Sequence, residues 1–259
     1  MTRGPRRDGA SHEAPAVARL ASPPRPVPPP SWLFPDPSTA DADGVVGVGA
    51  DLAPSTLVHA YRSGVFPWPH PRLPLPWFSP DPRGLMRPGS LHVSRSLRRR
   101  MRRCGWTTTV DAAFPAVVAN CAEPRGDDEG TWITPAMQRA YVRLHALGWS
   151  HSVEVWEGPE LVGGLYGVQV GGCFTGESMF HRASDASKVA LVDLAHRFAQ
   201  AGGRWLDLQI ATPHLLSLGA EEVPRSRFLR ELAAVKDNDV RLALDLRPVA
   251  RLADGAQLP

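Results

Sequence analysis

The sequence is poor in lysine and in cysteine, and it has no long apolar run. Only Lys188 and Lys236 are lysines among 29 Lys and Arg residues, so arginine carries nearly all the positive charge, and the net charge is only +3. The three cysteines, Cys104, Cys121 and Cys173, are widely spaced and odd in number, which fits neither a disulfide framework nor a CxxC metal site. The N-terminus lacks the apolar core of a signal peptide, and no segment is long and apolar enough to cross a bilayer. These absences point to a cytoplasmic protein without a membrane contact.

Proline divides the chain into parts. Residues 1–31 are rich in Pro and Arg and poor in large apolar side chains, so we predict a disordered tail there. A small N-terminal domain is predicted over residues 32–82. Its last part, FPWPHPRLPLPWFSPDPR, is expected to form a rigid connector, because each proline fixes φ and removes a backbone donor. A larger domain is predicted over residues 83–259, with its last residues unassigned.

The larger domain mixes helices and strands in an informative order. Breakers of the GP and GG type separate three runs at 151–157, 160–170 and 173–180, which predicts antiparallel hairpins. A helix at 185–201 and a strand at 204–210 come next. Further helices are predicted at 54–64, 93–103 and 134–148 and in HLLSLGAEEV, and further strands at 106–110 and 241–246. This order predicts an α+β protein in which the larger domain resembles the GCN5-related acetyltransferases, with a central mixed sheet flanked by helices.

The strand RWLDLQI carries an unusual polar row. Its side chains alternate between two faces, with Leu206, Leu208 and Ile210 on one and Trp205, Asp207 and Gln209 on the other. A carboxylate and an amide in an apolar region are costly unless they are hydrogen-bonded or used in catalysis. Asp207 and Gln209 are therefore either a catalytic pair or structural residues bonded to the nearby backbone.

Two classes of enzyme fit an acyltransferase fold, and the acyl donor separates them. A CoA-dependent N-acetyltransferase needs a glycine-bearing loop that presents backbone N–H groups to the pyrophosphate. The corresponding segment here, MFHRASDASKVAL, contains no glycine, which counts against CoA. The other class takes its acyl group from an aminoacyl ester on tRNA, and it needs a basic surface and aromatic faces.

One short basic segment favours the tRNA donor. Its arginines have no interleaved carboxylate and would repel one another without an anionic partner, although a solvated helix face is the plain alternative. A non-catalytic RNA-binding module is a third class, but it would not explain the polar row at Asp207 and Gln209. The arginines of the segment are Arg95, Arg98, Arg99, Arg100, Arg102 and Arg103.

The motifs between Trp32 and Val235 together resemble one family. They are, in order, GVFPWPHP, WFSPDPRG, SLHVSRSLRR, EGTWIT, HSVEVWEG, LVGGLYGV, FTGESMF, ASKVAL and LDLQI. On these motifs the chain is similar to the leucyl/phenylalanyl-tRNA–protein transferases.

The resemblance implies an activity. It is the transfer of Leu or Phe, and less well Met, from aminoacyl-tRNA to the α-amine of proteins that begin with Arg or Lys. The product is an N-degron for regulated proteolysis. We expect a monomer that needs no cofactor or metal, because the donor ester is already activated.

The resemblance also implies roles for three polar residues. Asp207 would polarise and orient Gln209, and Gln209 would handle the attacking amine. A direct base role for Asp207 is the competing version. Glu177, in TGESMF, would contact an amine of the donor or the acceptor.

An apolar aminoacyl pocket and a tRNA contact complete the implied site. Trp68 and Trp132 would sandwich the terminal adenine. Leu165 replaces a methionine of the best-known members and Leu194 an aromatic residue, so the preference between Leu and Phe stays open. The pocket wall would consist of Leu165, Met179, Leu191, Leu194, Phe198 and Leu206, although each reads as plain core without the resemblance. The tRNA phosphates would be held by Arg95, Arg98, Arg99, Arg102 and Arg103.

Overall fold

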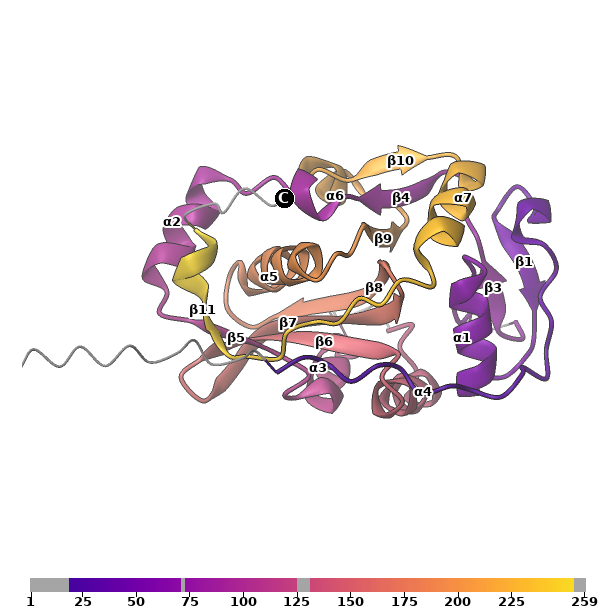
Figure 1. Cartoon of the computed structure of the whole chain (residues 1–259), viewed down its shortest axis with the longest axis horizontal. Coiled ribbons are helices and arrows are strands. Elements are labelled where there is room, and N and C mark those ends of the chain that lie inside the picture. The colour runs from indigo at the N-terminus through magenta and orange to yellow at the C-terminus, as the bar shows by residue number, and fades with distance from the viewer. Residues whose placement is uncertain (1–18, 71–72, 125–130, 254–259) are drawn as a thin grey trace, which may run out of the picture.

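The computed structural model describes residues 19–70, 73–124 and 131–253. A three-stranded sheet, ordered β1-β3-β2, and helix α1 form a small unit at one end of the molecule; an eight-stranded sheet with helices on both faces forms the rest (Figure 1). Within the described ranges no helix has the length and apolar character needed to span a membrane. The predicted α+β class is confirmed.

Helix α1 (Pro54–Arg62) begins and ends where the sequence predicts. Pro54 occupies the first turn, where its missing N–H leaves no bond unmade, and Gly64 follows the helix with a φ of 81°. The other elements of the small unit are η1 (Pro37–Thr39), β1 (Val45–Val48), β2 (Phe66–Pro67) and β3 (Pro76–Phe78).

The large sheet has the order β10-β4-β9-β8-β7-β6-β5-β11. Its pairs are antiparallel except that β8 and β9 run parallel, and these two pair only over residues 173–175 and 205–207 before they separate. The three predicted hairpin strands are confirmed as β6, β7 and β8. The strands are β4 (Arg83–Met86), β5 (Thr107–Val110), β6 (Ser150–Glu157), β7 (Glu160–Val170), β8 (Cys173–His181), β9 (Trp205–Gln209), β10 (Glu221–Val223) and β11 (Arg247–Pro248).

Two of the helices that cover the sheet start at residues suited to capping. Ser94 accepts a hydrogen bond from the N–H of Leu97 in α2, and Thr134 accepts one from the N–H of Met137 in α4. The helices are η2 (Pro88–Ser90), α2 (Arg95–Arg103), α3 (Phe114–Cys121), α4 (Pro135–Ala146), α5 (Ala186–Gln200), α6 (Pro213–Ser217), α7 (Arg225–Val235) and η3 (Val249–Leu252).

The two ends of the chain differ from the prediction. The expected strand at 241–246 is wrong, because that segment forms only an isolated bridge between Ala243 and Leu20, and the strand lies at β11. Residues 1–18 of the predicted tail lie outside the described residues. Residues 19–25 lie against the larger domain: the N–H of Ala21 donates to the carbonyl of Leu242 at 2.8 Å, and the N–H of Arg25 to that of Leu147 at 2.8 Å. Backbone bonds therefore order a segment that its composition assigned to disorder.

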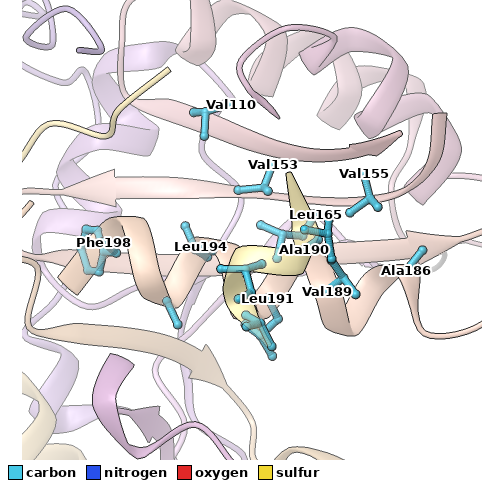
Figure 2. Close-up of a cluster of buried hydrophobic side chains, with 14 of the residues drawn as sticks. Val110, Val153, Val155, Leu165, Ala186, Val189, Ala190, Leu191, Leu194 and Phe198 are labelled. Atoms are coloured by element: carbon cyan, nitrogen blue, oxygen red, sulfur yellow. The ribbon is translucent and has the colours of Figure 1, made fainter. Parts of the chain in front are cut away.

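Helix α5 packs directly on β6 and β7. Buried side chains of the helix, among them Ala190 and Leu194, form one apolar cluster with Val153 and Leu165 of these strands (Figure 2). Gly163 of β7 permits the approach, since a Cβ there would lie 2.5 Å from the Cβ of Ala186. The close contact brings one face of α5 to the place where β8 and β9 separate.

Candidate active site

A cavity of about 360 Å³ opens beyond the point where β8 and β9 part. That size lies within the ~300–1,000 Å³ typical of small-ligand pockets. One part of its wall is apolar, and another part carries a carboxylate and an amide. The lining residues are Trp68, Trp132, Leu165, Tyr166, Phe174, Gly176, Glu177, Ser178, Met179, Leu191, Leu194, Leu206, Leu208, Gln209, Ile210, Thr212 and Leu215.

The apolar part contains five of the six predicted wall residues. Leu165 and Met179 face each other across β7 and β8, and Leu191, Leu194 and Leu206 complete this part.

The sixth predicted wall residue, Phe198, does not line the cavity. It is fully buried behind Phe174, whose ring meets it edge-on with centroids 6.1 Å apart. Helical spacing marks Phe198 as inward-facing, but it cannot tell which inward residue reaches the cavity. Phe174 forms that part of the wall.

Glu177 is the centre of a buried hydrogen-bond network. Its Oε1 accepts from the Tyr61 hydroxyl at 2.8 Å and from Nε2 of Gln209 at 2.9 Å, and its Oε2 accepts from the Tyr141 hydroxyl at 2.7 Å. The two hydroxyls lie 2.8 Å apart. Tyr61 comes from α1 and Tyr141 from α4, so the small unit contributes one of the donors of this network.

Burial gives Glu177 an unusual titration. Loss of hydration raises its pKa to about 7, and the hydrogen bonds from Tyr141 and Tyr61 oppose this rise only in part. A carboxyl group with such a pKa can both take up and release a proton near neutral pH, as general acid–base catalysis requires. The same burial, together with the neighbouring Glu177 charge, raises the pKa of both tyrosines well above its usual range, so they remain donors.

Asp207 lies beside the cavity and does not line it. Both of its oxygens are held by Arg83, whose Nε and Nη2 donate at 2.7 and 2.6 Å. Oδ2 also accepts from Thr175 Oγ1 at 3.1 Å, and Oδ1 from the backbone N–H of Gln209 at 3.0 Å. Asp207 is only 1% exposed, its two oxygens are engaged by Arg83, Thr175 and the Gln209 N–H, and the last contact ties it to the backbone of Gln209.

Gln209 lies at the end of β9 in a left-handed conformation, with a φ of 63°. Few residues other than glycine adopt this conformation. The bond from its N–H to Asp207 closes the turn, and the side chain then reaches Glu177. Its Nε2 is used in that contact, which leaves its carbonyl oxygen as the acceptor that an amine in the cavity would meet.

The sequence did not reveal Arg83, Tyr61 or Tyr141 as site residues. Arg83 is the last residue of the proline-rich connector, and the tyrosines lie on amphipathic helices, where each resembles an ordinary core residue. Arg83 is 124 positions from Asp207, so no local pattern links them. Only its place within the motif WFSPDPRG could have drawn attention to it.

The two indoles meet at the cavity mouth. The rings of Trp68, after β2, and Trp132, before α4, have centroids 6.0 Å apart and planes inclined at 36°. A base between them needs about 7 Å, twice the ~3.5 Å contact distance of carbon atoms. The pair is therefore nearly closed here and must turn parallel to accept a base.

The basic segment forms α2, which lies far from the small unit (Figure 1). Leu97 and Met101 bury one side of the helix, and all its arginines except the half-buried Arg98 are exposed. Arg98 and Arg102 donate to the carbonyl of Ala253, at 3.5 and 3.4 Å. The helix thus presents a positive face with no carboxylate among its own residues.

The chain is similar to an acetyltransferase of known structure and to two transferases with an aminoacyl-tRNA in their names. A GCN5-related N-acetyltransferase from Kribbella flavida is 16% identical, with 62% of this chain and 58% of that chain covered and a TM-score of 0.34. The leucyl/phenylalanyl-tRNA–protein transferase of Chromohalobacter salexigens is 53% identical over 215 residues, which are 83% of either chain. That of Shewanella halifaxensis is 46% identical over 81% of this chain and 89% of its own.

Family models agree with these relatives. The model described as leucyl/phenylalanyl-tRNA protein transferase matches residues 85–233, and that of the N-terminal domain of the same family matches residues 50–81. The two matches meet beside the domain boundary predicted after residue 82. The chain therefore belongs to the leucyl/phenylalanyl-tRNA protein transferase family of aminoacyltransferases.

Proposed function

We propose that the protein moves Leu or Phe, and less well Met, from aminoacyl-tRNA to the α-amine of proteins that begin with Arg or Lys. The product would be an N-degron for regulated proteolysis. The observation that carries the proposal is the cavity itself, in which an apolar wall adjoins the hydrogen-bonded pair of Gln209 and Glu177.

The donor would use three surfaces. Its Leu or Phe side chain enters the apolar part between Met179 and Leu194, and its terminal adenine separates Trp68 and Trp132. The exposed arginines of α2 bind the phosphates of the RNA, which gives affinity without sequence preference.

The chemistry needs little beyond positioning. The neutral amine attacks the ester carbonyl, the C–N bond forms, and the C–O bond to the ribose breaks. One proton leaves the amine and one is taken up by the ribose oxygen, so the step balances. The Gln209 carbonyl oxygen accepts an N–H of the amine and orients it. Ionised Glu177, which also lines the cavity, takes up the amine proton and passes it to the departing ribose oxygen.

The CoA-dependent alternative meets an obstacle at the start of α5. CoA would place its pyrophosphate at this N-terminus. Asp185 occupies the N-cap position in a left-handed conformation, with a φ of 70°, and its carboxylate pairs with Lys188 at 2.8 Å. This ion pair occupies the lysine that could otherwise attract a pyrophosphate, and the segment MFHRASDASKVAL contains no glycine for a phosphate-binding turn.

One assay tests the proposal. Purified protein receives radiolabelled Leu-, Phe- or Met-tRNA together with peptides that begin with Arg, Lys or Ala, and acetyl-CoA serves as the control donor. We expect label on the Arg and Lys peptides only. Acetylation without aminoacyl transfer would refute the proposal, and equal labelling of the Ala peptide would refute the acceptor specificity.

A further inference from the structure

Arg83 is a buried arginine at the place where the small unit, the large sheet and α7 meet. It begins β4, and only 1% of its surface is exposed. A guanidinium in such a place is costly unless nearly all of its donors are bonded. The groups that bind its donors therefore indicate its role in the structure.

Those contacts reach three parts of the molecule. Nε and Nη2 donate to the two carboxylate oxygens of Asp207 in β9, and Nη1 donates to the carbonyl of Gly64 in the small unit at 3.3 Å. The guanidinium also lies between two rings, 4.8 Å from the centroid of Phe66 in the small unit and 4.3 Å from that of Phe228 in α7. The fork and the flat faces of arginine are both used, and lysine offers neither.

We propose that Arg83 is a positioning residue for aminoacyl transfer, which holds Asp207, and through it Gln209, in place only when the small unit is docked. The inference rests on the proposed function. It extends that function by naming the group that links domain docking to the reacting strand.

The link consists of three successive contacts. Arg83 fixes both oxygens of Asp207, Asp207 binds the N–H of Gln209 in its left-handed conformation, and Gln209 contacts Glu177. Loss of the first contact frees the carboxylate to rotate and the turn at Gln209 to relax. Misplacement of a reacting group by about 1 Å can lower a rate about 100-fold.

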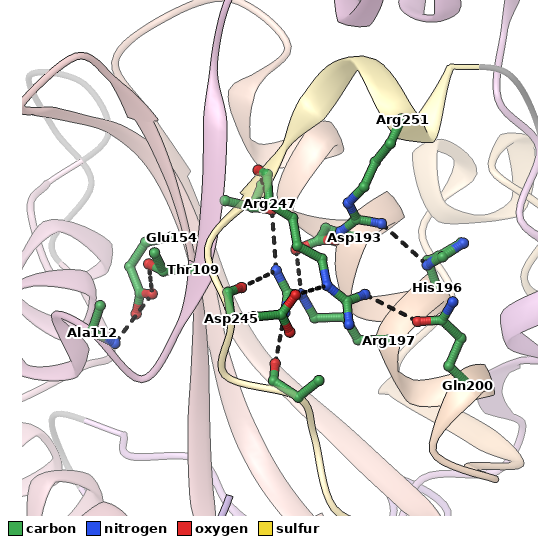
Figure 3. A network of polar contacts seen from close by, with 12 residues as sticks. Thr109, Ala112, Glu154, Asp193, His196, Arg197, Gln200, Asp245, Arg247 and Arg251 are labelled. Carbon is green, nitrogen blue, oxygen red and sulfur yellow. Dashed lines mark hydrogen bonds and ion pairs between the residues drawn. The ribbon is translucent and has the colours of Figure 1, made fainter. Parts of the chain in front are cut away.

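A purely structural ion pair is the rival explanation, and the chain contains a matched control for it. Arg197 and Asp193 on α5 form a second buried pair, with Nε and Oδ2 2.8 Å apart and both side chains fully buried (Figure 3). Arg197 also donates to the carbonyl of Ala243 and contacts Asp245, so this pair secures the C-terminal segment. It does not contact Asp207 or Gln209.

The test compares Arg83→Lys with Arg197→Lys in the full chain. Both substitutions weaken a buried pair, so unfolding in urea is measured for each, and transfer is assayed where both are folded. We expect kcat for Phe transfer to fall about 10- to 100-fold in Arg83→Lys and less than about threefold in Arg197→Lys. The Kd for Phe-tRNA should change less than about threefold in both.

A double-mutant cycle shows whether Arg83 acts through Asp207. In an Asp207→Asn background, Arg83→Lys should lower kcat by no more than about threefold, because the contact that it disturbs has lost its charge. A full 10- to 100-fold loss in that background would mean that Arg83 affects transfer by another route, and this would overturn the inference.

The remaining outcomes are also decisive. Equal effects of the two lysine variants on kcat would overturn the inference and leave the proposed function standing, whereas a wild-type chain without transfer activity would overturn both. If Arg83→Lys fails to fold, Phe228→Leu replaces it, since this change removes one ring over the guanidinium and leaves the ion pair. It should lower kcat at least threefold with an unchanged Kd, and an unchanged kcat would overturn the inference.

Discussion

Replacement of Glu177 by Gln tests the buried carboxyl group most directly. The variant keeps the shape of the side chain, and the network can accommodate it: the amide oxygen accepts from Tyr61 and Gln209, and the amide nitrogen donates to the Tyr141 hydroxyl. The change therefore removes the charge and leaves the packing.

The expected effect on stability follows from the raised pKa. Burial raises the pKa of Glu177 from 4.5 to about 7. The folded state thus holds a proton that the unfolded state releases, so the stabilisation from protonated Glu177 is complete below about pH 4.5 and is lost as the pH rises through about 7. Between pH 5 and 8 this loss amounts to roughly 2–3 kcal/mol, from about 1.4 kcal/mol per pKa unit.

Urea unfolding at a series of pH values measures this effect. The free energy of unfolding of Glu177→Gln minus that of the wild type should increase by roughly 2–3 kcal/mol between pH 5 and 8. Exposed Glu157, on β6, supplies the control, and Glu157→Gln should show a flat difference. A flat difference for Glu177→Gln as well would refute the buried, proton-binding carboxyl group.

The same variant separates two sources of pH dependence in catalysis. Wild-type kcat/KM for the acceptor peptide should rise through about pH 7 as Glu177 ionises. In the variant this rise should vanish, and only the ionisation of the acceptor amine near pH ~8 should remain. A rise at pH 7 that persists in the variant would remove Glu177 from the proton transfer.

Three further predictions concern the donor. Ala at both Arg99 and Arg103 should reduce the salt slope of Phe-tRNA binding by about 1.4–1.8, at ~0.7–0.9 per lost phosphate contact, and an unchanged slope in an anisotropy titration would show that α2 faces only solvent. Leu194→Phe should narrow the cavity and lower Phe transfer about tenfold relative to Leu transfer in a competition assay, whereas equal losses for both donors would exclude residue 194 from the pocket wall. Trp68→Leu should raise KM for aminoacyl-tRNA by about 5- to 150-fold, equivalent to ~1–3 kcal/mol of stacking, and a change below about threefold would contradict the adenine sandwich.

Local patterns in the chain were enough for much of the architecture. Thr134 followed by proline predicted the start of α4, and breakers at fixed places separated β6, β7 and β8. The polar alternation in β9 marked Asp207 and Gln209 before any contact was known. These features depend on neighbours along the chain, where side-chain period and backbone preference act.

Contacts between segments that lie far apart in the sequence could not be predicted from such local patterns. The partner of Asp207 is an arginine 124 positions earlier, and the partners of Glu177 come from two helices, α1 and α4. The ends of the chain show the same limit, since residues 19–25 are ordered by bonds to segments near residues 147 and 242.

The physical reason for this limit is that side-chain periodicity and composition indicate which side chains face the interior. They do not determine which residues each buried side chain contacts there. Residue chemistry alone marked the carboxylate of Asp207 and the amide of Gln209, and the resemblance to the family added Glu177, Trp68 and Trp132 as expected site residues. Packing alone determined that Phe174 and not Phe198 borders the cavity, and that Arg83 engages both oxygens of Asp207. Close packing and buried charge pairing act over short distances in space, whatever the distance along the chain.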